Sequence, residues 1–170
     1  MSCNAAGLPL TITDPLGATT SYERDSFGRP VALTDPLGRT THETWTVEGR
    51  LTHRQYPNGA TESWAYDGEG NCLTYTDRAD ATTSYEYGDF DLMVARTTPD
   101  GARYEFPHDA GLRMTGVTNP DGLTWTYAYD PAGRLLRQSD FDDRALSYAY
   151  DPAGRLTACT TALGENITYE

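Results

Sequence analysis

Residues 128–156 read AYDPAGRLLRQSDFDDRALSYAYDPAGRL, and the string AYDPAGRL occurs twice within them, at 128–135 and 149–156. The two copies are 21 residues apart. A fixed internal period is sought first in any sequence, because a missed repeat leads to the wrong fold. Here the period continues in both directions without a gap. The 170 residues therefore amount to about eight copies of one 21-residue unit.

Two glycine slots and two aromatic slots keep this register. The first glycine slot contains Gly17, Gly38, Gly59, Asp80, Gly101, Gly122, Asp143 and Gly164. The second glycine slot contains Gly7, Gly28, Gly49, Gly70, Asp91, Leu112, Gly133 and Gly154. The first aromatic slot contains Tyr22, Glu43, Trp64, Tyr85, Phe106, Tyr127, Tyr148 and Tyr169. The second aromatic slot contains Arg24, Trp45, Tyr66, Tyr87, His108, Tyr129 and Tyr150. Chance would not place four slots in one register.

Each unit spells two turns and two short strands. The string Asp-Pro-x-Gly, as at 14–17, suits a type I turn, and Tyr-Asp-x-x-Gly supplies a second reversal. The Thr-Thr-x-Tyr-x-Tyr segments between turns carry large residues with period two, which is a strand signal. Each unit is therefore predicted to be a pair of short antiparallel strands. Both faces of the second strand carry apolar residues, so the sequence leaves open which face is buried.

The predicted fold class is all-β, a continuous antiparallel meander of about sixteen strands. Strongly twisted open sheets rarely exceed about 10 strands without curling. We therefore expect the meander to curl into a spiral or a segment of a shell, with aromatic side chains stacked in ladders that fix the register. A four-bladed propeller with two units per blade is the alternative. It requires odd and even units to differ, and the slot three residues after the second glycine slot shows no such alternation.

Composition excludes several classes of protein. The formal net charge is −12, and all 13 basic residues are arginine with no basic run. Such a chain is a poor partner for phosphate backbones, so we expect no nucleic acid. No apolar stretch approaches the roughly 20 residues of a membrane span. Residues 1–17 lack the pattern of a signal peptide.

The polar residues suggest structure more than chemistry. His42, His53 and His108 occupy different slots, so they are expected to be ordinary side chains and not metal ligands. The three cysteines, Cys3, Cys72 and Cys159, take apolar slots and are expected to pack as small hydrophobes without disulfides. We predict no catalytic residue, no cofactor and no metal.

Charged side chains recur with the turns. The acidic clusters at 89–91 and 140–143 fall at turns, where aspartate caps its own backbone, so a pair of catalytic carboxylates is not expected. Arginine follows the second glycine slot in five units. Each of these arginines is expected to pair with a turn aspartate of a neighbouring unit; they are Arg29, Arg50, Arg113, Arg134 and Arg155.

The repeated YDPAGRL, the DPLG-x-TT-x-Y strings and the tyrosine-rich 21-residue period resemble the RHS or YD-repeat family over essentially the whole chain. The resemblance implies a large β-sheet that spirals into a hollow shell. In bacteria such shells typically belong to polymorphic or insecticidal toxins and enclose the toxic C-terminal region of the same polypeptide. The chain shows no family core segment before Glu170, no N-terminal plug and no cargo domain.

We therefore expect residues 1–170 to be a repeat array of a longer shell, non-enzymatic, with a structural role in enclosing and delivering a toxin. Its expected partners are adjoining repeats of the same or a neighbouring chain and the enclosed toxin. The full-length protein is expected to be secreted or at the cell surface. Because its terminal strands have no capping units, the isolated fragment is expected either to oligomerise edge to edge or to be only marginally stable.

A carbohydrate-binding or cell-surface adhesion module is the alternative function, with cell-surface glycans as partners. Aromatic faces stack on sugar rings, although packing within the sheet explains the fixed period better. The candidate stacking residues are Trp64, Tyr66, Tyr85, Tyr87, Trp125, Tyr127, Tyr129, Tyr148 and Tyr150.

Overall fold

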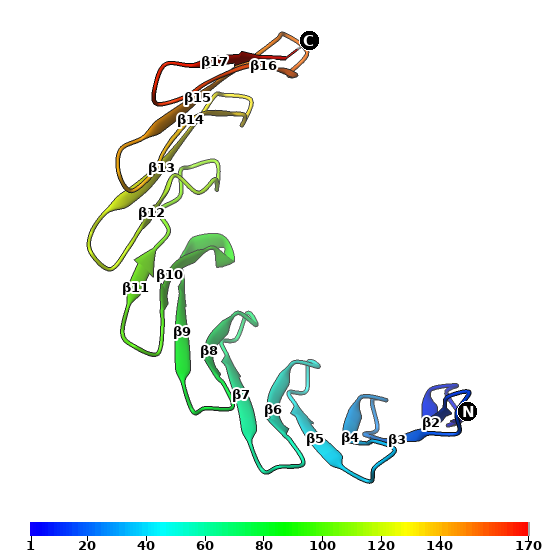
Figure 1. Ribbon diagram of the computed structural model, residues 1–170. Coiled ribbons are helices and arrows are strands. Elements are labelled where there is room, and N and C mark those ends of the chain that lie inside the picture. The colour runs from blue at the N-terminus through cyan, green and yellow to red at the C-terminus, as the bar shows by residue number, and fades with distance from the viewer. Residues whose placement is uncertain (170) are drawn as a thin grey trace. The chain divides into compact units, whose positions relative to one another are not determined.

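The computed structural model describes residues 1–169 and is all-β (Figure 1). Seventeen antiparallel strands alternate with turns, and η1 (Asp89–Asp91) is a short 3-10 helix. The prediction of an all-β antiparallel meander is confirmed. One strand more than expected is present, because residues near the N-terminus form the short strand β1. The chain divides into two compact parts. They are called unit 1 (residues 1–84) and unit 2 (the residues from 85 onward), and each contains several of the 21-residue repeat units.

In unit 1 each strand pairs with the next one in sequence. The strands are β1 (Ser2–Cys3), β2 (Pro9–Thr13), β3 (Thr19–Arg24), β4 (Pro30–Thr34), β5 (Thr40–Trp45), β6 (Leu51–Gln55), β7 (Thr61–Tyr66) and β8 (Cys72–Thr76). Strand β9 (Thr82–Tyr87) pairs with β8 and ends in unit 2.

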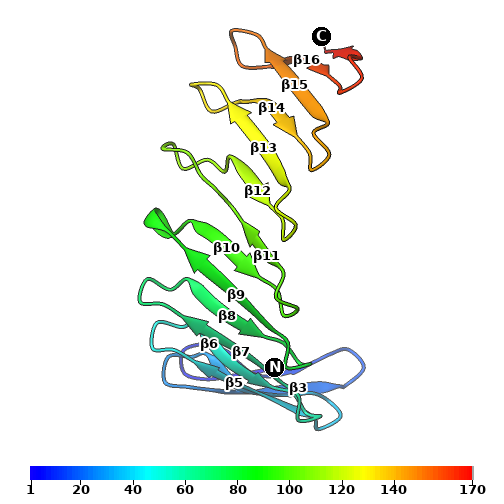
Figure 2. The ribbon, with the colours of Figure 1, turned by 90° about the vertical axis from the view of Figure 1, so that its left-hand side faces the viewer.

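Unit 2 continues the same pattern, and Figure 2 shows its strands joined by turns at alternate ends. The strands are β10 (Met93–Thr97), β11 (Arg103–Glu105), β12 (Gly116–Thr118), β13 (Thr124–Tyr129), β14 (Leu135–Ser139), β15 (Ala145–Tyr150), β16 (Leu156–Thr160) and β17 (Asn166–Thr168). In each unit more than four strands pair consecutively. The propeller alternative is therefore wrong, since four-stranded blades would interrupt the ladder.

The turns explain the two glycine slots. Every position of both slots has a positive φ, including Gly17 at 86° and Leu112 at 62°. Gly17 N–H donates to the Asp14 carbonyl at 3.0 Å, and Asp14 N–H donates to the Ala18 carbonyl at 3.0 Å. This pattern is a type I turn followed by a left-handed residue that forms a bulge. Only glycine adopts that conformation without a steric cost, which accounts for the repeat.

Turn aspartates cap their own backbone, as predicted. The Asp14 Oδ1 atom accepts hydrogen bonds from the N–H groups of Leu16 and Ala18, both at 2.9 Å. The same pair of bonds recurs at Asp140, inside one of the two acidic clusters, where the donors are Asp142 and Arg144. This carboxylate is thus occupied by turn chemistry.

Five of the hairpins that turn at the second glycine slot also contain a bulge that the sequence did not reveal. In the β3–β4 pair, Glu23 lies opposite Ala32 and Arg24 lies opposite Pro30, so Val31 is the extra residue. The same shift occurs in the pairs β5–β6, β7–β8, β13–β14 and β15–β16. A bulge bends the strand and increases its twist locally.

The aromatic face is the packed one. In β13 the side chains of Trp125, Tyr127 and Tyr129 are half-buried, whereas the alternate residues are exposed. On the partner strand both faces hold covered residues, since Gln138 opposite Tyr127 is half-buried and Ser139 on the other face is buried. Buried apolar residues are few, namely Ala32, Ala95 and Cys159, because one sheet has no opposing layer. None of the helical residues in 1–169 forms a segment of the length and apolarity needed to cross a bilayer.

Candidate functional site

Five members of the second aromatic slot tie their repeat unit to the preceding one. The Tyr129 hydroxyl donates to the Met114 carbonyl, fifteen residues earlier, at 2.8 Å. Equivalent bonds join Tyr66 to Leu51 at 2.9 Å, Tyr150 to Leu135 at 2.9 Å, Trp45 to Pro30 at 2.7 Å and Arg24 to Pro9 at 3.0 Å. The polar end of these side chains is therefore used inside the sheet.

The arginine after the second glycine slot completes this tie. Arg134 Nε donates to Asp130 Oδ2 of its own turn at 2.6 Å, and Nη1 donates to the Asp151 carbonyl of the next unit at 3.3 Å. Its guanidinium carbon lies 5.0 Å from the centre of the Tyr150 ring. Arg113 repeats the arrangement over Tyr129, also at 5.0 Å. These distances suit a cation–π contact.

The prediction that these arginines pair with a turn aspartate of a neighbouring repeat unit is wrong. For four of the five, the paired carboxylate lies four residues earlier in the same turn, in Arg29–Asp25, Arg113–Asp109, Arg134–Asp130 and Arg155–Asp151. Arg50 has Thr46 at that position, and its Nη2 donates to the Glu69 carbonyl at 3.2 Å. The turn folds that carboxylate back toward the arginine, so it is nearer than an aspartate of the next unit. The neighbouring unit is reached through its backbone carbonyl instead. The backbone N–H of Arg134, with smaller help from its side chain, lowers the pKa of Asp130 against the opposing effect of burial.

The first aromatic slot makes contacts that differ from unit to unit. Trp64 stacks on Tyr75 across the β7–β8 pair, with ring centres 5.3 Å apart and planes at 28°. Arg54 lies 5.8 Å from the Trp64 ring. In β15 the Tyr148 hydroxyl accepts a hydrogen bond from Gln138 at 2.7 Å.

Trp125 lies one position before the repeat's aromatic slots on the same face. It meets Phe141 edge to face at 5.7 Å and Tyr127 at 6.4 Å. Its Nε1 atom is buried without a partner among residues 1–169. It also lines a cavity of about 340 Å³ together with Gln138 and Asp140.

Stacked aromatic rings do not recur from one repeat unit to the next, contrary to the predicted ladder. None of the three ring contacts just described joins equivalent slots of neighbouring units. The recurring partner of the ring is an arginine, and the recurring polar contact is a backbone carbonyl. The remaining candidates, Tyr85 and Tyr87, lie half-buried in β9. The nine candidate residues are thus spread over β7, β9, β13 and β15 and do not converge on one cleft.

Unit 1 contains a charged cluster that the sequence analysis missed. Glu62 is only 9% exposed, and its two carboxylate oxygens accept hydrogen bonds from the hydroxyls of Tyr56 at 2.8 Å and Tyr75 at 3.2 Å. Arg54 and Arg78 lie 3.6 and 3.8 Å away. Burial, and then the nearby Glu62 charge, raise the pKa of Tyr75. A buried charge with this many partners is a structural tie. Glu62 itself could have indicated this cluster, because several other repeat units have threonine at the equivalent position.

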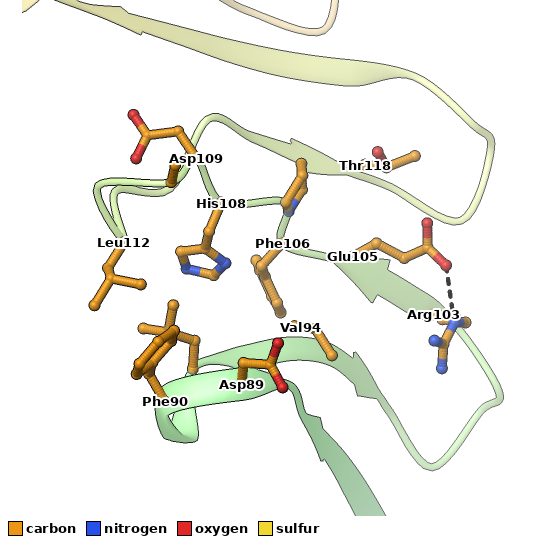
Figure 3. Close-up of a pocket in the computed structure, with 13 residues that line it drawn as sticks. Asp89, Phe90, Val94, Arg103, Glu105, Phe106, His108, Asp109, Leu112 and Thr118 are labelled. Atoms are coloured by element: carbon orange, nitrogen blue, oxygen red, sulfur yellow. Dashed lines mark hydrogen bonds and ion pairs between the residues drawn. The ribbon is translucent and has the colours of Figure 1, made fainter.

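Unit 2 contains a cavity of about 860 Å³ beside the 88–91 turn (Figure 3). Phe90, Leu112 and His108 gather at one end, and the Arg103–Glu105 ion pair lies at the other. The Nδ1 atom of His108 is buried without a partner in the described part of the chain. His108 was expected to be an ordinary side chain, and no pattern in the sequence indicates this cavity.

Residues 1–169 do not assemble a metal-binding site or a site with a reactive thiol. No group of three or more histidine, cysteine or acidic side chains there could hold a metal ion. Cys3 is exposed, Cys72 half-buried and Cys159 buried, and all three are free thiols. Burial raises the pKa of the Cys72 thiol, which disfavours its reactive thiolate form.

Comparison with solved structures identifies the fold. A Tc holotoxin pore from Photorhabdus luminescens superposes with a TM-score of 0.67 at 19% identity, covering 89% of this chain and 9% of that chain. A complex of TcdB2, TccC3 and Cdc42 gives a TM-score of 0.69 at 19% identity, covering 89% of this chain and 10% of that one. The chain thus spans about a tenth of the chains that it matches.

Comparison of sequences identifies the family. No curated protein matches the chain. A family model described as RHS Repeat, however, matches residues 4–40, 66–103 and 108–145, which together make up more than half of the sequence. These segments contain the glycine and aromatic slots that build the turns and ties described above. The chain belongs to the RHS repeat family.

Proposed function

We propose that this chain is a wall segment of a larger shell that encloses a toxic polypeptide and takes part in its delivery. The role is mechanical: the wall separates the enclosed polypeptide from the cell that makes it. The observation that supports the proposal most directly is the recurring tie between units. A tyrosine hydroxyl, an arginine and a left-handed turn recur every 21 residues, which suits a surface built by extension.

The chemistry of the side chains agrees with a mechanical role. The turn carboxylates accept hydrogen bonds from their own turns, and the hydroxyls of Tyr66, Tyr129 and Tyr150 donate to backbone carbonyls. These groups are therefore committed to holding the sheet. The proposed partners are adjoining repeats and the enclosed polypeptide, and the proposed location of the full-length protein is outside the producing cell or at its surface.

Protease protection of the full-length protein tests this function. The complete polypeptide that carries these repeats is treated with proteinase K, and the survival of its non-repeat regions is followed by mass spectrometry. We expect an enclosed region to survive far longer than the same region expressed alone. A second sample carries Tyr129→Phe, Tyr150→Phe and Arg134→Met, which cut the ties in unit 2 and should shorten the protection.

Tyr22→Phe is the matched control for that variant, because the Tyr22 hydroxyl makes no hydrogen bond within residues 1–169 and its ring contact with Arg24 is kept. Equal digestion of the enclosed and the free regions would overturn the proposal. Protection that depends on the repeats would support it.

Trp125 favours carbohydrate binding as a second candidate function. Its indole N–H has no partner in the described chain, and the ring lines a cavity with Gln138, whose amide oxygen can accept a hydrogen bond from a sugar hydroxyl. Trp64 is less suited, because Tyr75 and Arg54 lie against its ring. A glycan array should then lose signal with Trp125→Ala and keep it with Trp64→Ala. An array without any signal removes this candidate.

A further inference from the structure

The departures from the repeat in unit 2 converge on one cavity. The second glycine slot holds Asp91 and Leu112 in two successive units, although glycine occupies it in all the others. The second aromatic slot holds His108, which cannot make the hydroxyl bond that Tyr129 makes. Phe90, Leu112 and His108 all line the 860 Å³ cavity. Places where several local rules fail together are candidate functional sites.

The backbone at the cavity is strained. Leu112 has a φ of 62°, and Phe90 and Asp91 have φ values of 61° and 58° in succession. This left-handed conformation is unfavourable for residues with a Cβ, and especially for large ones. Residues in such strained conformations cluster at functional sites. Here the strained residues place two large apolar groups, Phe90 and Leu112, at the edge of the cavity, as Figure 3 shows.

The strand pairing is also interrupted here. Pro107 has no N–H group to donate, and β11 ends two residues before it. Strands β11 and β12 share one register pair, Glu105 with Thr118, and the hairpin continues as an isolated bridge between His108 and Met114, whereas the equivalent hairpin β13–β14 has four register pairs. Both Glu105 and Thr118 line the cavity.

The polar groups of the cavity define what it can bind. The Asp89 carboxylate is exposed and has no partner within residues 1–169. Arg103 is neutralised by Glu86 and Glu105, with 3.0 Å between Nη2 and Glu86 Oε2. The cavity therefore presents an apolar wall beside an uncompensated negative charge, in a chain whose net charge is −12. Its volume lies within the range of about 300–1,000 Å³ typical of ligand sites.

We propose that this cavity binds a polypeptide segment in which an aromatic or large aliphatic residue is followed by lysine or arginine. The apolar side chain packs against Phe90 and Leu112, and the cation pairs with Asp89. The cavity extends from the 88–91 turn to the Arg103–Glu105 pair, so it has room for adjacent side chains of one segment. The inference rests on the geometry of unit 2 alone and is independent of the shell function.

The test is an NMR titration of the 170-residue chain with the acetylated peptide amide Gly-Phe-Lys-Gly. We expect shifts confined to residues 88–118. Leu112→Gly restores the repeat, so it should raise the thermal unfolding midpoint by a few degrees and weaken binding at least about fivefold. Asp89→Asn should weaken this peptide several-fold and leave the peptide Gly-Phe-Gln-Gly unchanged.

Asp143→Gly is the matched control, because Asp143 is a left-handed residue of the same unit, with a φ of 60°, outside the cavity. It should raise the unfolding midpoint and leave binding unchanged. The proposal is overturned by peptide shifts scattered over the sheet, by no binding at millimolar peptide, or by binding to Leu112→Gly at wild-type strength. Binding of phenethylamine without binding of the peptide would also overturn it.

Discussion

At the scale of single residues, backbone conformation determines where glycine recurs. Gly59 has a φ of 83° and Gly68 does not have a positive φ, yet a Cβ added at either would meet no atom within 4 Å. Gly59→Ala should therefore reduce the free energy of unfolding by about 1–2 kcal/mol through backbone strain alone. Gly68→Ala is the control and should not destabilise. Urea denaturation measures both, and equal effects would contradict the argument.

The turn aspartates give the fold a defined response to acid. The backbone N–H of the arginine four residues on is the largest cause of the lowered pKa of Asp35, Asp130 and Asp151. A carboxyl whose pKa is lower in the folded state stabilises the fold above its unfolded pKa of about 3.9, and that stabilisation is lost as the pH falls. Stability should therefore change little between about pH 8 and 5 and decline below about pH 4.

Asp151→Asn isolates one contribution to this decline. Asparagine can cap the turn, as Asn119 does in this chain, but it carries no titrating charge. The variant should lose less stability than the wild-type chain between pH 5 and 3, as followed by circular dichroism during urea denaturation. An equal loss of stability between pH 5 and 3 in the variant and the wild-type chain would show that Asp151 does not contribute to the acid response.

The roles of single residues could be predicted from the sequence where the interacting groups lie within one turn. The glycine slots and the capping aspartates follow from the spelling of Asp-Pro-x-Gly, because donor and acceptor lie within four residues. The partner of Arg134 was not readable in the same way. Its choice between Asp130 and an aspartate of the next unit depends on distances in the folded turn.

At the scale of strands and hairpins, the hydroxyl ties hold neighbouring units together. Tyr66→Phe removes the 2.9 Å bond to the Leu51 carbonyl and leaves the ring beneath Arg50. The loss should cost about 0.5–1.5 kcal/mol, and more if the carbonyl is left without water. Tyr22→Phe in the same unit removes a hydroxyl without such a bond and should be neutral. A larger loss for Tyr22→Phe than for Tyr66→Phe would refute the role of the tie.

The strands themselves were predictable, and their distortions were not. Alternation of large side chains located β13 and β15, and the two glycine slots located the two turns between them. The bulge at Val31 and its equivalents could not be foreseen, since the extra residue is defined by pairing with another strand. The Glu62 cluster and the 860 Å³ cavity share this difficulty. Each is built by substitutions in separate units that matter only when the units lie side by side.

At the scale of the whole molecule, a sheet with little buried apolar area depends on its ladder of hydrogen bonds. In this chain β17 pairs with β16 on one side, and Tyr169 N–H donates to the Thr157 carbonyl at 2.9 Å. Because successive N–H groups alternate in direction along a strand, Thr168 N–H faces away from β16. That edge can accept another strand, and a net charge of −12 opposes the approach of a second chain.

The 170-residue chain should therefore self-associate more strongly as salt screens this repulsion. Sedimentation velocity at 50 and 500 mM NaCl, over a range of protein concentrations, should show a weight-average mass that rises with both variables. Thr168→Pro removes the outward N–H and should reduce the rise, whereas Thr168→Val keeps the N–H and should preserve it. A monomer at every concentration and salt level would contradict the prediction. Association that Thr168→Pro leaves intact would place the contact elsewhere on the sheet.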